Sequence, residues 1–133
     1  MLESRKHPRY SITIQVRGWL FDTVGEAQAL DAETMNVSRE GIQILYYDEE
    51  ERMQFIQSLL SKNQPVGLEM VLPRTGDRIA ATGRVRWYKI GSTDRSLQYL
   101  IAGIVLEHIR PEEKMEWERF IEDAARITTR EAM

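Results

Sequence analysis

The chain has 133 residues, of which 42% are hydrophobic and 29% charged, and its formal net charge is −3. This length suits one domain with one hydrophobic core, and the acidic balance argues against a general nucleic-acid binder, which usually gathers positive charge on one face. The sequence has no cysteine, which excludes disulfides and thiolate chemistry. No apolar run approaches the roughly 18–20 residues that a membrane helix needs, and the first residues lack a signal-peptide core, so we expect a cytoplasmic protein without membrane insertion.

The charges are unevenly distributed along the chain. Residues 1–17 carry four basic side chains and a single acidic one, Glu3. The molecule as a whole therefore repels polyanions, whereas its N-terminal part can attract a small anion. This asymmetry favours a compact phosphate-bearing ligand.

Strand patterns dominate the first two-thirds of the chain. Apolar and polar residues alternate over residues 12–21, which is typical of a strand with one buried face. Residues 22–25 read as a turn, and further strands are predicted over 26–35, 42–46, 66–72, 79–88 and 97–106, with loops at 73–77 and 91–96. Six strands with short connections predict mostly antiparallel pairing, in a barrel or a sandwich.

Two helices are predicted beside these strands. Asp48 and Glu51 have the spacing of a capping box, and an apolar stripe follows, so we expect a helix over Asp48–Leu60. A second helix is expected after Pro111, over residues 111–129, because proline suits the first helical position and two glutamates follow it. Its apolar face is expected to consist of Trp117, Phe120, Ile121, Ala124 and Thr128.

The sequence offers little that could perform catalysis. His7 and His108 are the only histidines, and without cysteine a metal site would depend on carboxylates. We interpret His108, at the end of a strand, as a structural or surface residue. No glycine-rich phosphate loop is present, and the carboxylates fall mostly on helix surfaces. We therefore expect no enzyme activity, no metal and no cofactor.

Two arginines precede the first strand. Arg5 and Arg9 are four residues apart, and Pro8 disfavours helix at the residue before it, so residues 1–10 are expected to form an extended arm. A guanidinium binds phosphate oxygens bidentately, donates to the O6 and N7 of guanine, and stacks on a base. By itself, however, such a pair is more often a solvated basic tail.

A polar segment, Asn36–Gly41, joins the second and third strands. Asn36 and Ser38 can hydrogen-bond the edge of a base, and Gly41 permits either a positive φ or a close approach of the backbone. Taken alone, the same residues also describe an ordinary turn.

Together, the two motifs are specific. Arg5-x-x-x-Arg9 followed by Asn36-x-Ser38-x-x-Gly41 resembles the PilZ family of bacterial receptors for cyclic di-GMP. Gly83–Trp87 is similar to the family's Gly-x-Val-x-Trp strand, and Gly103–Leu106 is similar to its last barrel strand. The resemblance covers nearly the whole chain, and the order of the motifs agrees with the strand pattern.

The resemblance implies a six-stranded antiparallel barrel over residues 11–108, flanked by the two helices in a single domain of residues 1–133. It also implies that the ligand lies on the outer surface of the barrel. Arg5 and Arg9 would hold phosphates and guanine edges, Asn36 and Ser38 would read a guanine, and Gly41 would let the backbone turn beside it. Lys6 and Arg39 are candidates for additional ligand contacts.

Three further positions bear on this expectation. Asn36 stands where aspartate is commonest in the family and asparagine is a known alternative. An amide offers one acceptor oxygen, so binding is expected to be kept, at the same or a lower affinity. Ser4 stands where many relatives have another arginine, which leaves the ligand stoichiometry open. Trp87 shares the apolar face with Val85, and this pattern favours core packing over base stacking.

The function that these observations predict is a non-catalytic receptor that binds cyclic di-GMP and relays the signal through contacts with a protein effector, as a monomer or homodimer. One alternative is a ligand-independent interaction module with the same fold. A second alternative is a small barrel that binds single-stranded nucleic acid, against which the acidic balance argues.

Overall fold

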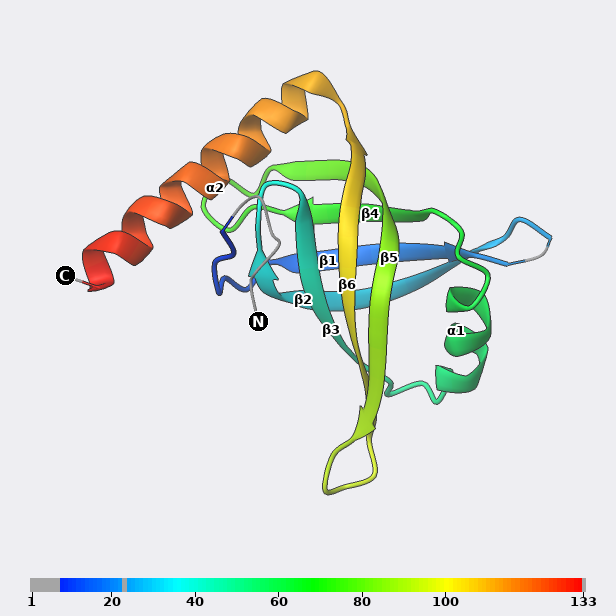
Figure 1. Cartoon of the computed structure of the whole chain (residues 1–133). Helices are drawn as coiled ribbons and strands as arrows, with labels where there is room; N and C mark the ends of the chain where they lie inside the picture. Colours follow the sequence, from blue (N-terminus) through cyan, green and yellow to red (C-terminus); the bar gives the residue numbers. More distant parts are fainter. Residues whose placement is uncertain (1–7, 23, 133) are drawn as a thin grey trace.

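The computed structural model describes residues 8–22 and 24–132, with side-chain burial as far as residue 126. Six strands form a closed antiparallel barrel in the order β1-β2-β3-β6-β5-β4 (Figure 1). This confirms the predicted fold and decides between the barrel and the sandwich. The strands are β1 (Gln15–Phe21), β2 (Ala27–Val37), β3 (Gly41–Tyr47), β4 (Val66–Val71), β5 (Arg78–Ser92) and β6 (Gln98–Ile109).

Alternation along the strands fills the barrel. On β3, for example, Ile42, Ile44 and Tyr46 are buried, whereas the residues between them face outward. Such alternation places one side of every strand in the core. β5 and β6 end later than the sequence pattern predicts, β5 at Ser92 and β6 at Ile109, and their connection is the loop at the lower end of Figure 1. The loop expected over residues 91–96 therefore lies at residues 93–97.

The helix α1 (Met53–Leu60) closes one end of the barrel with three buried side chains, Met53, Ile56 and Leu59. The predicted range Asp48–Leu60 and its capping box are wrong. Glu51 has a φ of 55° and lies before the helix. Asp48 instead reaches forward from the loop, where its carboxylate accepts the N–H groups of Arg52 at 2.9 Å and Met53 at 2.7 Å.

The helix α2 (Pro111–Ala132) follows β6 and covers the opposite end, where the β2–β3 and β4–β5 turns lie (Figure 1). Trp117, Ile121 and Ala124 are buried, as the apolar face predicts. Glu113 anchors the first turn, because its carboxylate accepts the Ala80 N–H at 2.9 Å, and this bond and the nearby Arg110 lower the pKa of Glu113. Within the described residues, neither helix is long and apolar enough to cross a bilayer.

Candidate functional site

The turn between β2 and β3 is closed by Ser38. The Ser38 N–H donates to the Gly41 carbonyl at 2.9 Å, and the Gly41 N–H donates to Ser38 Oγ at 3.1 Å. The Ser38 hydroxyl donates to the same carbonyl at 3.2 Å. Because Ser38 is only 4% exposed, its hydroxyl serves the turn itself. Direct contact of Ser38 with a guanine stays a prediction.

Gly41 is needed where this turn passes β6. A Cβ at Gly41 would lie 2.8 Å from the Ile104 carbonyl oxygen, closer than Cβ atoms approach in folded proteins. Next to it, the Glu40 carbonyl accepts the Leu106 N–H at 2.8 Å. The φ of Gly41 lies outside the left-handed region, so close backbone approach is the reason for this glycine.

Arg9 is connected to the same turn through its neighbour Tyr10. The Tyr10 N–H donates to the Val37 carbonyl and the Val37 N–H donates to the Tyr10 carbonyl, both at 2.8 Å, in an isolated antiparallel bridge. Arg9 precedes Tyr10, and Asn36 precedes Val37. The bridge therefore brings Arg9 beside the Asn36–Gly41 turn, although the two motifs are far apart in the sequence.

The other basic candidates differ in what the structure says of them. Arg5 and Lys6 lie outside the described residues, so the structure gives no geometry for their predicted ligand contacts.

Arg39 is attached to α2 in two ways. Its carbonyl accepts the Trp117 Nε1–H at 3.2 Å, and its guanidinium lies 3.3 Å from the Glu122 carboxylate. The predicted turn is thus linked directly to the C-terminal helix.

Asn36 lies at a β-bulge that adds an outward side chain to β2. The register with β3 shifts between Thr34 and Asn36, so that Met35 and Asn36 lie opposite Gln43. Asn36 Nδ2 donates to Gln43 Oε1 at 2.9 Å, and Gln43 Nε2 donates to the Met35 sulfur at 3.5 Å. Met35 is 39% exposed, and Asn36 and Gln43 are partly exposed. The three side chains form one patch on the outer face.

Trp87 extends this patch to β5, and its predicted place in the core with Val85 is wrong. A register shift between these two residues turns the tryptophan outward, where it is 42% exposed. The indole lies against Gly103, and a Cβ added there would collide with the ring. Gly103 is paired with both Trp87 and Gln43. Asn36, Gln43, Gly103 and Trp87 therefore form a row across β2, β3, β6 and β5, which we call the outer-face row.

Sequence reasoning missed two members of this row. Gln43 carried a usable signal, since it is a polar residue between Ile42 and Ile44 on a buried strand and must face outward. No sequence signal indicated that Trp87 faces outward. A β-bulge adds one residue to a strand, so a two-residue alternation that ignores the bulge assigns the residues beyond it to the wrong face.

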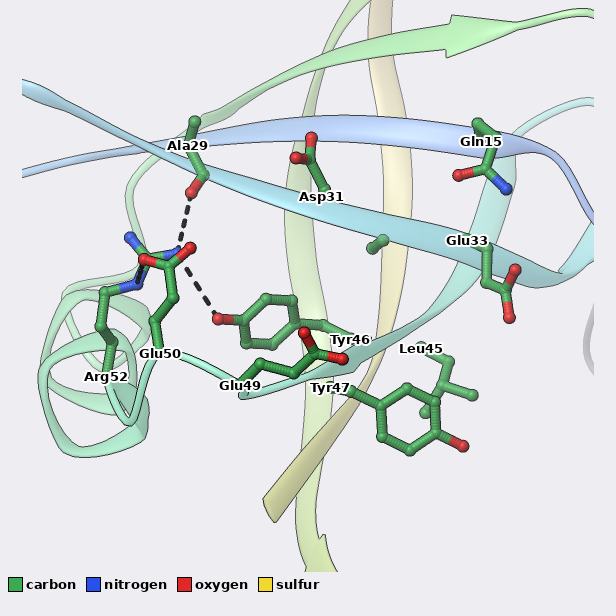
Figure 2. A pocket seen from close by; sticks show the side chains of 11 residues that line it. Gln15, Ala29, Asp31, Glu33, Leu45, Tyr46, Tyr47, Glu49, Glu50 and Arg52 are labelled. Atoms are coloured by element: carbon green, nitrogen blue, oxygen red, sulfur yellow. Dashed lines mark hydrogen bonds and ion pairs between the residues drawn. The ribbon is translucent and has the colours of Figure 1, made fainter. Parts of the chain in front are cut away.

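A pocket of about 400 Å³ lies on the outer side of β1, β2 and β3 (Figure 2). Its charged lining consists mainly of carboxylates: Asp31, Glu33, Glu49 and Glu50, with Arg52 the basic residue. An acidic lining disfavours a dianionic ligand. This pocket is therefore a poorer place for a phosphate-bearing ligand than the outer-face row.

Arg52 offsets the charge of one carboxylate, that of Glu50, and its guanidinium is held within the pocket wall. Nη2 donates to the Ala29 carbonyl at 3.1 Å and to the Tyr46 hydroxyl at 3.4 Å, and Nε lies 3.3 Å from the Glu50 carboxylate (Figure 2). Burial raises the pKa of Tyr46.

The described residues contain no cluster of three or more histidine, aspartate or glutamate side chains placed to hold a metal ion. His108 is exposed at the end of β6, in agreement with its interpretation as a surface residue. His7 lies outside the described residues.

Comparisons with known proteins place this geometry in context. Residues 3–123 match the family model described as PilZ domain. The PilZ domain with c-di-GMP of YcgR from Escherichia coli is similar in fold, with 11% identity, a TM-score of 0.67 and 98% of each chain covered. The motility inhibitor MotI/DgrA from Bacillus subtilis has 14% identity and a TM-score of 0.65, with 97% of this chain and 53% of that chain covered.

MrkH from K. pneumonia in its apo state has 17% identity and a TM-score of 0.68, with 98% of this chain and 55% of that chain covered. The chain thus spans about half the length of MotI and MrkH. A comparison with curated protein sequences found no match.

Proposed function

Since this chain belongs to the PilZ domain family, whose members are generally non-catalytic receptor domains, we propose that it is a cytoplasmic bacterial receptor for cyclic di-GMP. The ligand-binding residues are Arg5, Arg9, Asn36, Ser38 and Gly41. The observation that carries the proposal is the Tyr10–Val37 bridge, because it brings Arg9 beside the Asn36–Gly41 turn. Among the similar structures, YcgR and MrkH have been solved with c-di-GMP.

The chemistry of the surface suits this ligand. Arg5 and Arg9 of the arm (residues 1–10) bind phosphate oxygens and guanine acceptors through the planar guanidinium fork. Asn36 accepts from a guanine, and Ser38 and Gly41 shape the turn on which it stands. Trp87 supplies an exposed indole at the far end of the outer-face row, on which a second base can stack.

The relay runs through α2. The turn and the helix share the Trp117–Arg39 hydrogen bond and the Arg39–Glu122 ion pair, so a ligand that displaces Arg39 also acts on the helix. A protein effector that reads α2 would then sense the occupied turn. Coupling between two sites requires contacts that differ between the free and the bound state, and the contacts of Arg39 with α2 would differ in this way.

The ligand-independent module and the nucleic-acid barrel predict different titrations. Calorimetry with cyclic di-GMP and, separately, with a single-stranded oligonucleotide distinguishes them. Our proposal expects heat from the cyclic dinucleotide alone, and the ligand recovered afterwards should be chemically unchanged. Binding of neither molecule would favour the module, binding of the oligonucleotide would favour the nucleic-acid barrel, and recovery of linear dinucleotide or GMP would contradict the non-catalytic assignment.

Arg9 provides the sharpest test of the site. Arg9→Lys keeps the charge but loses the planar fork, so its affinity should fall nearly as far as that of Arg9→Ala. Losing hydrogen bonds to a charged group costs about 1.5–3 kcal/mol, which corresponds to roughly tenfold to a hundredfold in Kd. Arg74→Ala, in the exposed β4–β5 turn, is the matched control and should bind like the unmodified protein. A lysine variant with unchanged affinity would mean that Arg9 acts only as a diffuse charge.

A further inference from the structure

The outer side of β3 and β6 carries an apolar area beside the outer-face row. Leu45 and Tyr47 alternate with buried residues of β3. Tyr99 and Ile101 alternate in the same way on β6, where Ile101 is paired with Leu45 and Tyr99 with Tyr47. The outward residues of an antiparallel sheet that faces water are normally polar. Four outward apolar side chains on two neighbouring strands therefore point to a partner surface.

A glycine lets the Tyr99 ring lie close to the sheet. The ring covers Gly91 of the neighbouring strand β5, where any Cβ would collide with it. Tyr47 packs on this ring edge to face, with 6.4 Å between the ring centroids. Tyr47 is nevertheless 45% exposed. The contacts within the chain therefore leave a large part of this apolar area open to solvent.

Opposite charges flank the apolar area on its two sides. Glu33 of β2 is paired with Leu45, and Lys89 of β5 is paired with Ile101, so one row across four strands reads acidic, apolar, apolar, basic. Glu33 also lines the acidic pocket of Figure 2, whereas the exposed Arg86 adds positive charge on the β5 side. Neither Glu33 nor Lys89 forms an ion pair with another residue in the described part of the chain. Both charges are thus available to an oppositely charged group of a partner.

We propose that this surface is self-complementary and that two copies of the chain form a symmetric dimer through it. A two-fold axis that runs along the strands between β3 and β6 lays the row over itself in reverse order. Glu33 then faces Lys89 of the second copy, and Leu45 faces Ile101 of the second copy. Such an isologous arrangement closes at two chains. We call this surface the association face; it consists of Glu33, Leu45, Tyr47, Lys89, Tyr99 and Ile101.

A second copy suits the association face because the row is its own complement. The dimer covers the apolar centre and places each charge against an opposite one. The strands of the two copies run nearly aligned, as they do when two sheets pack face to face. The charges at the rim fix the register, whereas the apolar centre provides the burial. No dinucleotide is needed, so this inference is independent of the proposed ligand.

Charge reversal at the rim tests the arrangement. Sedimentation equilibrium without ligand measures the dimer Kd of the unmodified chain, Glu33→Lys, Lys89→Glu and the double variant. Each single reversal removes both ion pairs of the symmetric dimer and brings like charges together. We expect the Kd of each single variant to rise roughly tenfold at low salt. The double variant has opposite charges at both positions again, and its Kd should return to within about threefold of the unmodified value.

A mixture of the two single variants provides the sharpest test. In the mixed dimer, Glu33→Lys supplies two basic groups and Lys89→Glu supplies two acidic groups, so both rim contacts again join opposite charges. The Kd of the mixed dimer should therefore lie roughly tenfold below that of either variant alone. A folding defect in one variant cannot produce this rescue. A mixed dimer no tighter than the separate variants would overturn the two-fold arrangement.

Matched controls reverse the same charges elsewhere. Glu26→Lys in the β1–β2 turn and Lys62→Glu after α1 change exposed residues outside the association face, and both should leave the Kd unchanged. Ile101→Thr keeps a β-branched residue on β6 but removes apolar surface, and should raise the Kd roughly fivefold. Thermal unfolding checks that each variant is folded. An unmodified chain that stays monomeric up to about 1 mM would overturn the dimer and leave the receptor function standing, as would controls that weaken the dimer as much as the Glu33 and Lys89 variants do.

Discussion

The two ends of the barrel are closed by helices that are attached in different ways. At one end, α1 is held by Asp48, which is 3% exposed and accepts from the Arg52 and Met53 N–H groups and from the Tyr46 hydroxyl. All of these partners belong to β3, the following loop and the helix itself. At the other end, α2 is held by Trp117, which is fully buried and donates to a carbonyl of the β2–β3 turn.

This difference separates a fixed closure from a responsive one. The α1 end depends on a short, local set of bonds that lies away from the outer-face row. The α2 end depends on the Asn36–Gly41 turn, beside which Arg9 lies. We therefore expect substitutions at the α1 end to change stability alone, and substitutions at the α2 end to change the response to a ligand as well.

The largest expected effect is at the α1 end. Asp48→Ala leaves two N–H groups and one hydroxyl without their acceptor, and should lower the free energy of unfolding by about 3 kcal/mol. Urea denaturation measures this loss. Glu49→Ala, an exposed neighbour on the same loop, should change stability by less than about 0.5 kcal/mol. Similar losses in the two variants would show that Asp48 does not anchor the helix.

Trp117→Phe should have an intermediate effect. It removes the Nε1–H bond to the Arg39 carbonyl and part of the buried ring, at a cost of about 1–2 kcal/mol. The comparison of the two ends predicts a second consequence. Cyclic di-GMP should change amide hydrogen exchange in α2 less in the Trp117→Phe variant than in the unmodified protein. An α2 response of unchanged size would mean that the signal does not pass through this bond.

The smallest expected effect is that of Glu122→Gln. The Arg39–Glu122 pair is exposed, at 42% and 57% of the two side chains, so breaking it should change stability by less than about 0.5 kcal/mol. The released Arg39 charge lies near the proposed anion site, and affinity for cyclic di-GMP should therefore rise by about twofold at low salt. Glu118→Gln, also on α2, serves as the control for net charge. Equal gains in both variants would assign the effect to net charge alone.

Much of the fold followed from local pattern. Alternation located all six strands, and Pro111 with the apolar stripe around Trp117 located α2. The start of α1 was predicted too early. Asp48 caps the helix from the preceding loop, and Glu51 in that loop has a φ of 55°, which is not a helical conformation. The capping-box spacing of Asp48 and Glu51 therefore did not mark the first turn.

The ends of β5 and β6 were placed too early. The added residues of β5 are paired with β6 alone, and such pairing depends on the partner strand and not on a buried face. The added residues of β6 pair with Ala81 and Thr82 although they are partly or fully exposed.

The candidate site was predictable only in part. The two motifs were visible in the sequence, but the position of Arg9 beside the second motif depends on the Tyr10–Val37 bridge, a long-range pairing that neither segment encodes alone. The orientation of Asn36 depends on Gln43 and on the bulge at Met35, which only the register of two strands reveals. The outward position of Trp87 likewise follows from a register shift.

Closure of the barrel also limits how this protein can associate. A strand paired on both sides has no backbone groups left for an incoming chain, whereas an open edge invites fibre growth. In the described ladders, β5 is paired with β4 only as far as Gly83, and from Arg84 to Ser92 its pairing is with β6 alone. That stretch carries Arg84, Arg86 and Lys89, and such cations disfavour edge-to-edge contact between copies. Charge repulsion along this stretch of β5 therefore opposes aggregation through its open edge.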